Sequence, residues 1–78
     1  MIETMKKLLN AINTLKSEGF AVTGQCASYV RLKKNGNWVD LSRDGSSYLA
    51  YNLDGREHCL DVDAEDLGWT VEFAVANF

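Results

Sequence analysis

Residues 28 to 42 read S-Y-V-R-L-K-K-N-G-N-W-V-D-L-S, and this stretch decides the fold of the chain. Two runs in which apolar and polar residues alternate flank the pair Asn35-Gly36. An Asn-Gly pair favours a type I′ turn, because both central residues of that turn need a positive φ. The stretch therefore predicts a β-hairpin whose two-residue loop is Asn35-Gly36.

The two faces of this hairpin define its register. With that loop, one face holds two apolar pairs, which are Leu32 with Val39 and Val30 with Leu41. The other face holds three pairs, which are Lys33 with Trp38, Arg31 with Asp40, and Tyr29 with Ser42. A slip of one residue would send the apolar pairs to the solvent side and would separate the cation from the anion.

Residues 2 to 18 predict an amphipathic helix that covers the sheet. Its apolar residues recur every three or four positions and form one stripe, made of Ile2, Met5, Leu8, Leu9, Ile12 and Leu15. Gly19 supplies the left-handed conformation that ends a helix, and Phe20 stands where a Schellman motif places an apolar contact with Leu15. A short first strand is expected over residues 20 to 26.

Two further turns extend the sheet beyond the central hairpin. A three-residue loop at 43–45, with Gly45 in the left-handed region, places Leu49 opposite Val39. A two-residue loop at Asp54-Gly55 then places Leu60 opposite Leu49 and His58 opposite Tyr51. In this register the inner face also takes Leu53 and Val62, whereas the outer face takes Tyr48, Ala50, Cys59 and Asp61.

The C-terminal part has two possible interpretations. Residues 63 to 68 indicate a short acidic helical turn, capped by Asp63 and closed by Gly68. Alternating residues then predict a last strand over 69 to 76, with one face made of Trp69, Val71, Phe73 and Val75. A helix is the alternative, because helical spacing also connects Leu67, Val71, Ala74, Val75 and Phe78. We favour the strand, since Gly68 would interrupt a helix that began at Asp63.

Together these elements predict one α+β domain over residues 1–78. An N-terminal helix packs on one face of a four- to five-stranded antiparallel sheet, and a short acidic helical turn precedes the last strand. A chain of 78 residues that is 46% hydrophobic and 24% charged suits a small globular domain of this kind. The second face of the sheet is left open to solvent or to a partner.

Charge is distributed unevenly along the chain, although the net charge is only −3. Residues 1–43 carry seven Lys and Arg against three acids, a balance of +4, whereas residues 44–78 carry one Arg against eight acids, a balance of −7. The two halves either lie side by side and neutralise one another, or they create a field that steers a charged partner.

The sequence also indicates a cellular location. No stretch approaches the roughly 18 apolar residues of a membrane span, and the first residues do not form a signal peptide. Cys26 and Cys59 are far apart and are expected to be reduced, partly buried thiols. We therefore expect a cytoplasmic protein with no membrane association.

Residue patterns that carry catalytic or metal chemistry have little support. His58 and Cys59 are neighbours in a predicted strand, so their side chains would point to opposite faces and could not act as a pair. The acidic residues do not have the spacing of an EF-hand, and no glycine pattern matches a phosphate-binding loop. We expect a half-buried His58, no enzymatic activity, no cofactor and no metal site.

Two groups of residues are candidates for binding a partner. Aromatic and basic side chains share the outer face of the sheet, namely Tyr29, Arg31, Lys33, Trp38 and Tyr48. An acidic group follows, made of Asp61, Asp63, Glu65 and Asp66. These residues predict an inhibitor or adaptor that occupies a surface of a larger protein. A nucleic-acid-processing complex is one candidate partner, because carboxylates would stand in for phosphates there. Small size and acidity are typical of accessory proteins from phages or mobile elements.

Two alternatives use the same surfaces differently. The open sheet face or an edge strand could form a homodimer. Aromatic residues interleaved with Arg31, Lys33 and Lys34 could instead bind single-stranded nucleic acid weakly, although the net charge is negative.

Overall fold

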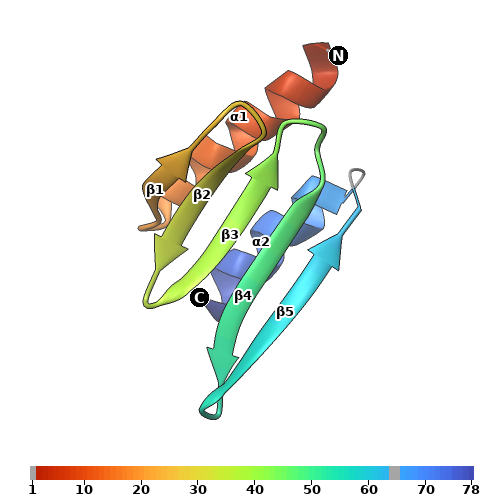
Figure 1. The fold of residues 1–78 in the computed structure, drawn as a ribbon. Helices are drawn as coiled ribbons and strands as arrows, with labels where there is room; N and C mark the ends of the chain where they lie inside the picture. The colour runs from red at the N-terminus through yellow and green to blue at the C-terminus, as the bar shows by residue number, and fades with distance from the viewer. Residues whose placement is uncertain (1, 64–65) are drawn as a thin grey trace.

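The computed structural model describes residues 2–63 and 66–78, and it has two layers (Figure 1). In chain order its elements are α1 (Ile2–Ser17), β1 (Ala21–Gln25), β2 (Tyr29–Lys34), β3 (Asn37–Ser42), β4 (Ser47–Leu53), β5 (Arg56–Val62) and α2 (Leu67–Asn77). The strands form one antiparallel sheet in the order β1-β2-β3-β4-β5, and both helices lie against the same face of it. The α+β class, the N-terminal helix and the antiparallel sheet are confirmed.

The central hairpin has the predicted register at every position. The five expected pairs are present between β2 and β3, from Tyr29–Ser42 to Lys33–Trp38, and Lys34–Asn37 beside the turn is a sixth. Asn35 and Gly36 have φ values of 54° and 80°, as a type I′ turn requires. The second two-residue turn, at Asp54 and Gly55, has nearly the same φ values of 54° and 78°.

The remaining pairings between strands also match the predicted registers. Gly45 has a φ of 96°, and the three-residue loop places Leu49 opposite Val39. In the next pair of strands Leu60 lies opposite Leu49, and His58 lies opposite Tyr51. Strand β1 is present too, with a bulge between Val22 and Gly24.

The end of α1 is a Schellman motif, as the sequence predicts. The amide of Phe20 donates to the carbonyl oxygen of Leu15 at 3.0 Å, and the amide of Gly19 donates to that of Lys16 at 3.2 Å. Gly19 has a φ of 96°, and both Leu15 and Phe20 are buried in the core. The helix therefore stops where its last carbonyl groups find donors.

The stripe predicted for α1 is only partly correct. Leu8 and Leu15 are buried and Ile12 is half-buried, but Met5 is 60% exposed and Leu9 is 56% exposed. The buried set follows the spacing of Leu8, Ala11 and Leu15 instead. Met5 and Leu9 instead border an open groove with Gln25 and Val30, and Figure 1 shows that the N-terminal end of α1 projects beyond the sheet.

The predicted last strand is wrong, since this segment is the helix α2. Its buried residues Leu67, Thr70 and Ala74 follow helical spacing, and Phe78 continues the series. Gly68 does not end a turn but lies in the first turn of α2, where a helix tolerates it more easily than in its middle. The inner face of β3 and β4 needs an apolar cover that α1, lying behind β1 and β2, does not provide (Figure 1).

The acidic turn before α2 also differs from the prediction. Asp66, rather than Asp63, is the N-cap residue, and its side chain makes no capping hydrogen bond. The amide of Asp66 donates to the carbonyl oxygen of Asp63 at 3.0 Å. Glu65, a predicted binding residue, lies outside the described residues.

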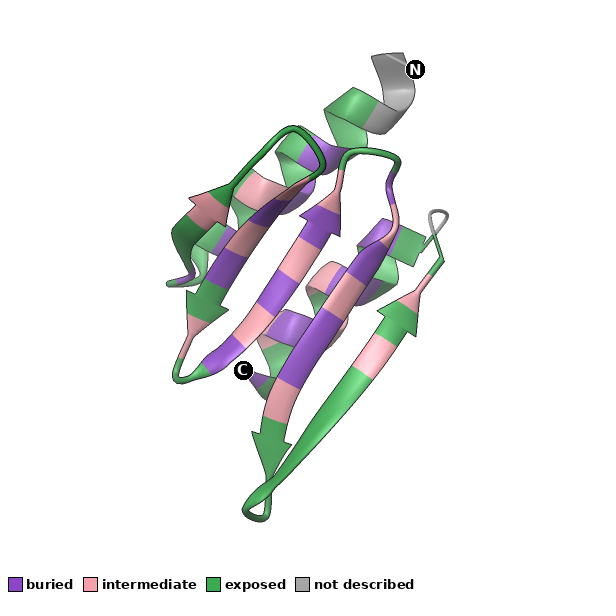
Figure 2. Cartoon of the chain, viewed as in Figure 1, coloured by how far each residue is buried: buried purple, intermediate pink, exposed green. Residues whose placement is uncertain are grey.

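The core lies between the sheet and the two helices. Figure 2 shows buried and half-buried residues alternating along β3 and β4, whereas most of β5 is exposed. A buried hydrogen bond of 2.8 Å between the hydroxyl groups of Ser47 and Thr70 joins β4 to α2. Among the elements that the structure describes, none covers the face of the sheet opposite the helices, and the side chains of that face form the candidate site.

Candidate protein-binding surface

The outer face of the sheet carries a continuous group of aromatic and charged side chains. Strand pairing places the predicted residues Tyr29, Arg31, Trp38 and Tyr48 on this face, in the middle three strands. All four are partly exposed. We call these four residues and Asp40 the outer-face cluster.

Arg31 is held at the centre of the outer-face cluster by Asp40. The Nε of Arg31 donates to Oδ1 of Asp40 at 2.7 Å, and its Nη2 donates to Oδ2 at 2.9 Å. The side chain of Arg31 is 36% exposed and that of Asp40 is 16% exposed. The hydrogen bond with Asp40 raises the pKa of Arg31 above its ordinary value. This two-pronged geometry fixes the plane of the guanidinium group.

The same guanidinium group lies over an aromatic ring. The Cζ of Arg31 is 4.4 Å from the ring centroid of Trp38 and 5.8 Å from that of Tyr29. Trp38 in turn lies beside Tyr48, with ring centroids 5.4 Å apart and planes inclined at 37°. Five side chains from three strands therefore lie against one another in the absence of a partner.

The acidic residue Asp61 adjoins this cluster. It lies opposite Tyr48 in the sheet, and Cys59 lies opposite Ala50 on the same face. A hydrogen bond with the Cys59 thiol, partial burial and the charges of Asp61 and Glu57 raise the pKa of Tyr48. The outer face therefore changes along the sheet from the paired cation on β2 to carboxylates on β5.

The other predicted binding residues lie at the margins of this surface. Lys33 is exposed on the same face, at the end of β2. Asp63 follows β5 and Asp66 precedes α2, and both residues are exposed. The structure thus brings Asp61 close to the aromatic residues, and it places Asp63 and Asp66 beyond the end of the strand.

Sequence reasoning missed one exposed aromatic residue near the acidic group. Trp69 is 46% exposed in α2 and stacks on Phe73, with ring centroids 5.1 Å apart. It borders a hollow of about 240 Å³ that is lined by Leu60, Asp61, Val62, Asp63, Asp66 and Trp69. Helical spacing from Leu67 would have placed Trp69 off the buried stripe, but the strand interpretation concealed this.

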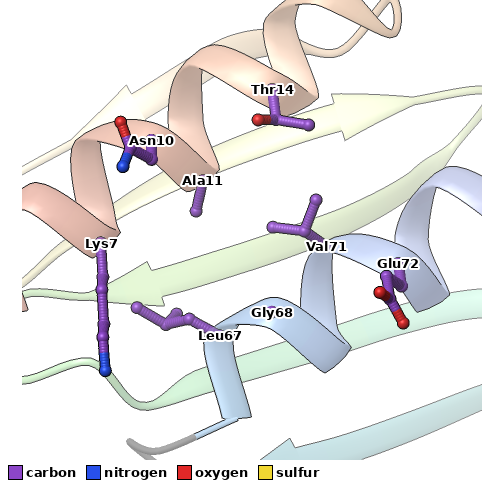
Figure 3. A pocket seen from close by; sticks show the side chains of 8 residues that line it. All are labelled: Lys7, Asn10, Ala11, Thr14, Leu67, Gly68, Val71 and Glu72. Atoms are coloured by element: carbon purple, nitrogen blue, oxygen red, sulfur yellow. The ribbon is translucent and has the colours of Figure 1, made fainter.

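Two larger hollows lie on the helical side of the molecule. One of about 450 Å³ separates the helices, where Lys7, Asn10, Ala11 and Thr14 of α1 face Leu67, Gly68, Val71 and Glu72 of α2 (Figure 3). The other, of about 610 Å³, is a more apolar groove beside α1, lined by Met5, Leu8, Leu9, Ile12, Gln25, Val30, Arg43 and Asp44. The exposed side chains of Met5 and Leu9 form part of the wall of this groove.

Histidine and cysteine residues are distributed over the sheet. His58 is exposed rather than half-buried, and it stacks on Tyr51 of the inner face with ring centroids 5.3 Å apart. Cys59 lies on the outer face, so the two neighbouring side chains diverge as predicted. Cys26 and Cys59 are exposed rather than partly buried. Cys26 follows β1 and Cys59 belongs to β5, at opposite ends of the strand order.

Within residues 2–63 and 66–78, no group of three or more His, Cys, Asp or Glu side chains has a geometry that could hold a metal ion. In the same ranges, neither helix has the length and apolar character needed to cross a membrane.

Comparisons with models of protein families, with curated proteins and with solved structures gave no match to this chain.

Proposed function

We propose that this protein is a non-enzymatic binding module that docks the open face of its sheet on a larger protein. The ordered arrangement of Arg31 between Asp40 and the ring of Trp38 is the observation that carries this proposal. Trp, Tyr and Arg provide most of the binding energy in protein interfaces. Side chains that are ordered before binding lose less conformational entropy when a partner covers them.

The acidic margin of the same surface indicates the charge of the partner. Asp61 adjoins Tyr48, and Asp63 and Asp66 extend the negative charge beyond β5. A basic surface on the partner would meet these carboxylates while its apolar part covers Trp38. Such a module would act as an inhibitor or adaptor, and a basic nucleic-acid-processing protein is a fitting partner.

A protein partner is favoured over nucleic acid by the state of Arg31. Both prongs of its guanidinium group already bind Asp40, so they are not directed at a phosphate. Lys33 remains as an exposed cation on this face, but Asp61 and Glu57 supply negative charge across the sheet. Salt-dependent binding to phosphates would need more cations than these.

A cytoplasmic location also forms part of the proposal. Exposed thiols are typical of proteins that remain in a reducing compartment. Cys26 and Cys59 are separated by the width of the sheet, which at about 4.8 Å per strand exceeds the reach of a disulfide within one chain.

The test compares capture of partners by the wild-type protein and by Trp38→Ala. Tagged protein is used to capture partners from the native host, and each captured protein is then purified and its Kd is measured by calorimetry. We expect Trp38→Ala to weaken binding by about 30-fold or more, because a central tryptophan typically contributes about 2 kcal/mol. Charge reversal at Asp61 and Asp63 should weaken the same complex.

The matched control is Leu9→Ala, which removes an exposed apolar side chain on the opposite, helical side. It should leave the Kd unchanged. Melting curves must show that Trp38→Ala keeps its stability, so that loss of binding is not loss of fold. A purified partner that binds wild type and Trp38→Ala equally well would refute docking through the open face.

A further inference from the structure

Strand β5 has a regular free edge, unlike the strand at the other side of the sheet. It is last in the strand order and pairs with β4 through seven consecutive residues without a bulge. Strand β1, at the opposite edge, is shorter and bulged between Val22 and Gly24. Bulges and short length protect an edge from pairing with further strands, and β5 has neither protection.

The free backbone groups of this edge follow from the turn that precedes it. Leu53 and Arg56 flank the two-residue turn and therefore form a hydrogen-bonded pair. Hydrogen-bonded and non-hydrogen-bonded pairs alternate in an antiparallel ladder. Glu57, Cys59 and Asp61 consequently direct their amide and carbonyl groups away from β4, toward the open edge.

The side chains along this edge are acidic and discourage pairing of β5 with itself. A two-fold pairing with Cys59 on the axis would place Glu57 opposite Asp61 twice. A shift to Leu60 on the axis would place Glu57 opposite Asp63 twice. Like charges that face each other across strands are destabilising, so both of these registers are unfavourable for a second copy of this chain.

Apolar side chains lie on the other side of the same edge. Leu60 and Val62 point toward the helices and are half-buried, and Trp69 of α2 stands beside them. These residues line the hollow of about 240 Å³ described above. The edge therefore presents carboxylates toward the outer face, and beside its inner face lies a hollow that Leu60, Val62 and Trp69 line together with three aspartates.

We propose that the free edge of β5 binds an extended segment of another protein in which basic and apolar residues alternate. The segment adds a sixth strand, with backbone hydrogen bonds to Glu57, Cys59 and Asp61. Its cations lie beside Glu57 and Asp61, and its apolar side chains lie over the hollow next to Trp69. This inference rests on the proposed function, because it names the chemistry of the partner that the module would bind.

The first experiment uses a capped synthetic peptide, as long as β5, in which lysine alternates with valine. Amide chemical shifts and hydrogen exchange of the labelled protein are followed during titration. We expect saturable shifts in β5 and at the Trp69 indole, and slower exchange of the amides of Glu57, Cys59 and Asp61. Two control peptides, one with glutamate in place of lysine and one with all lysines grouped at one end, should not bind.

The second experiment compares two substitutions at one position. Cys59→Pro removes an amide that makes no bond with β4, which is where an edge strand tolerates proline. We expect this substitution to weaken binding of the lysine-valine peptide by about tenfold, because a backbone hydrogen bond is lost. Cys59→Ser keeps the amide and should bind as wild type does.

A third variant decides the question even if Cys59→Pro fails to fold. Glu57→Lys combined with Asp61→Lys should reject the lysine-valine peptide and bind the glutamate-valine peptide instead. Glu72→Lys, which reverses a single charge on α2, should leave the original preference unchanged. Circular dichroism melting of each variant verifies the fold.

The outcomes separate this inference from the proposed function. Failure of the lysine-valine peptide to bind at β5, or equal binding of the grouped peptide, overturns the edge site even where capture of a partner still depends on Trp38. Conversely, Trp38→Ala should bind the peptide normally. Peptide shifts that map to β1 or to the outer-face cluster also overturn the edge site.

Discussion

The pair of Arg31 and Asp40 was deduced from sequence because it depends on local register alone. Once Asn35 and Gly36 form the turn, counting residues along two strands places the guanidinium opposite the carboxylate. Exposure does not follow from such counting. Leu53 lies on the inner face as predicted, yet it is exposed, because it stands at the end of the hairpin beyond the reach of α2.

Cys26 provides a test of a single side chain. Its Sγ accepts the amide of Ser28 at 3.4 Å, and the amides of Ser28 and Tyr29, with a smaller effect of Arg43, lower its pKa below the ordinary thiol value. We expect Cys26 in the Cys59→Ser variant to react with iodoacetamide with a pH midpoint below that of a free cysteine. Thiolate is the reacting form, so a lower pKa moves the rate profile toward lower pH.

Unfolding the same variant in urea is the control for Cys26. In urea, the pH midpoint for the reaction of Cys26 should rise to the ordinary value, because the two backbone amides no longer face the sulfur.

The lowered pKa of Cys26 also affects stability, and the sign of this effect follows from linkage. A lowered pKa in the folded state makes folding more favourable as pH rises from the folded value to the unfolded value, and this gain is lost as pH falls again. An identical midpoint with and without urea would contradict the assignment.

Among the secondary-structure elements, α2 is the one that sequence reasoning assigned incorrectly. Residues 69–76 alternate in apolar character, but α2 is apolar on nearly all sides, so a period of two and a period of 3.6 fit it equally well. The strands carried less ambiguity, since turns with positive φ separate them and their polar faces are distinct. Tertiary packing decided the case, because the inner face of β3 and β4 needs a helix to cover it.

Gly68→Ala tests the helical state of this segment. A Cβ at Gly68 would meet no atom within 4 Å, and the position has an ordinary helical φ. Alanine should therefore stabilise the protein by about 0.5 kcal/mol, the lower end of the range for a glycine in the middle of a helix, measured by urea unfolding. The same change at Gly36, whose φ is 80° and whose surroundings are equally open, should destabilise by about 1 kcal/mol. Destabilisation by Gly68→Ala would contradict the helix.

Taken together, the strand order determines how the charges of the molecule are arranged. Residues 1–43 form α1 and β1 to β3, and residues 44–78 form β4, β5 and α2. Because the strands lie in chain order, the basic half of the chain lies toward the β1 edge of the sheet and the acidic half lies toward the β5 edge. The ion pair of Arg31 with Asp40 lies wholly within the basic half. The arrangement therefore favours a charge field that steers a partner over mutual neutralisation.

The same arrangement leads to a prediction about self-association. Acidic residues oppose pairing of two β5 edges, and the bulge in β1 disrupts the other edge. We expect the protein to sediment as a monomer of 8.7 kDa at micromolar concentration, in both low and moderate salt.

A dimer that is lost in Trp38→Ala but kept in Leu9→Ala would mean that the open face binds a second copy, as in the alternative of a homodimer. A dimer kept in both variants but lost in Cys59→Pro would instead mean that β5 pairs with itself, despite the repulsion between Glu57 and Asp61.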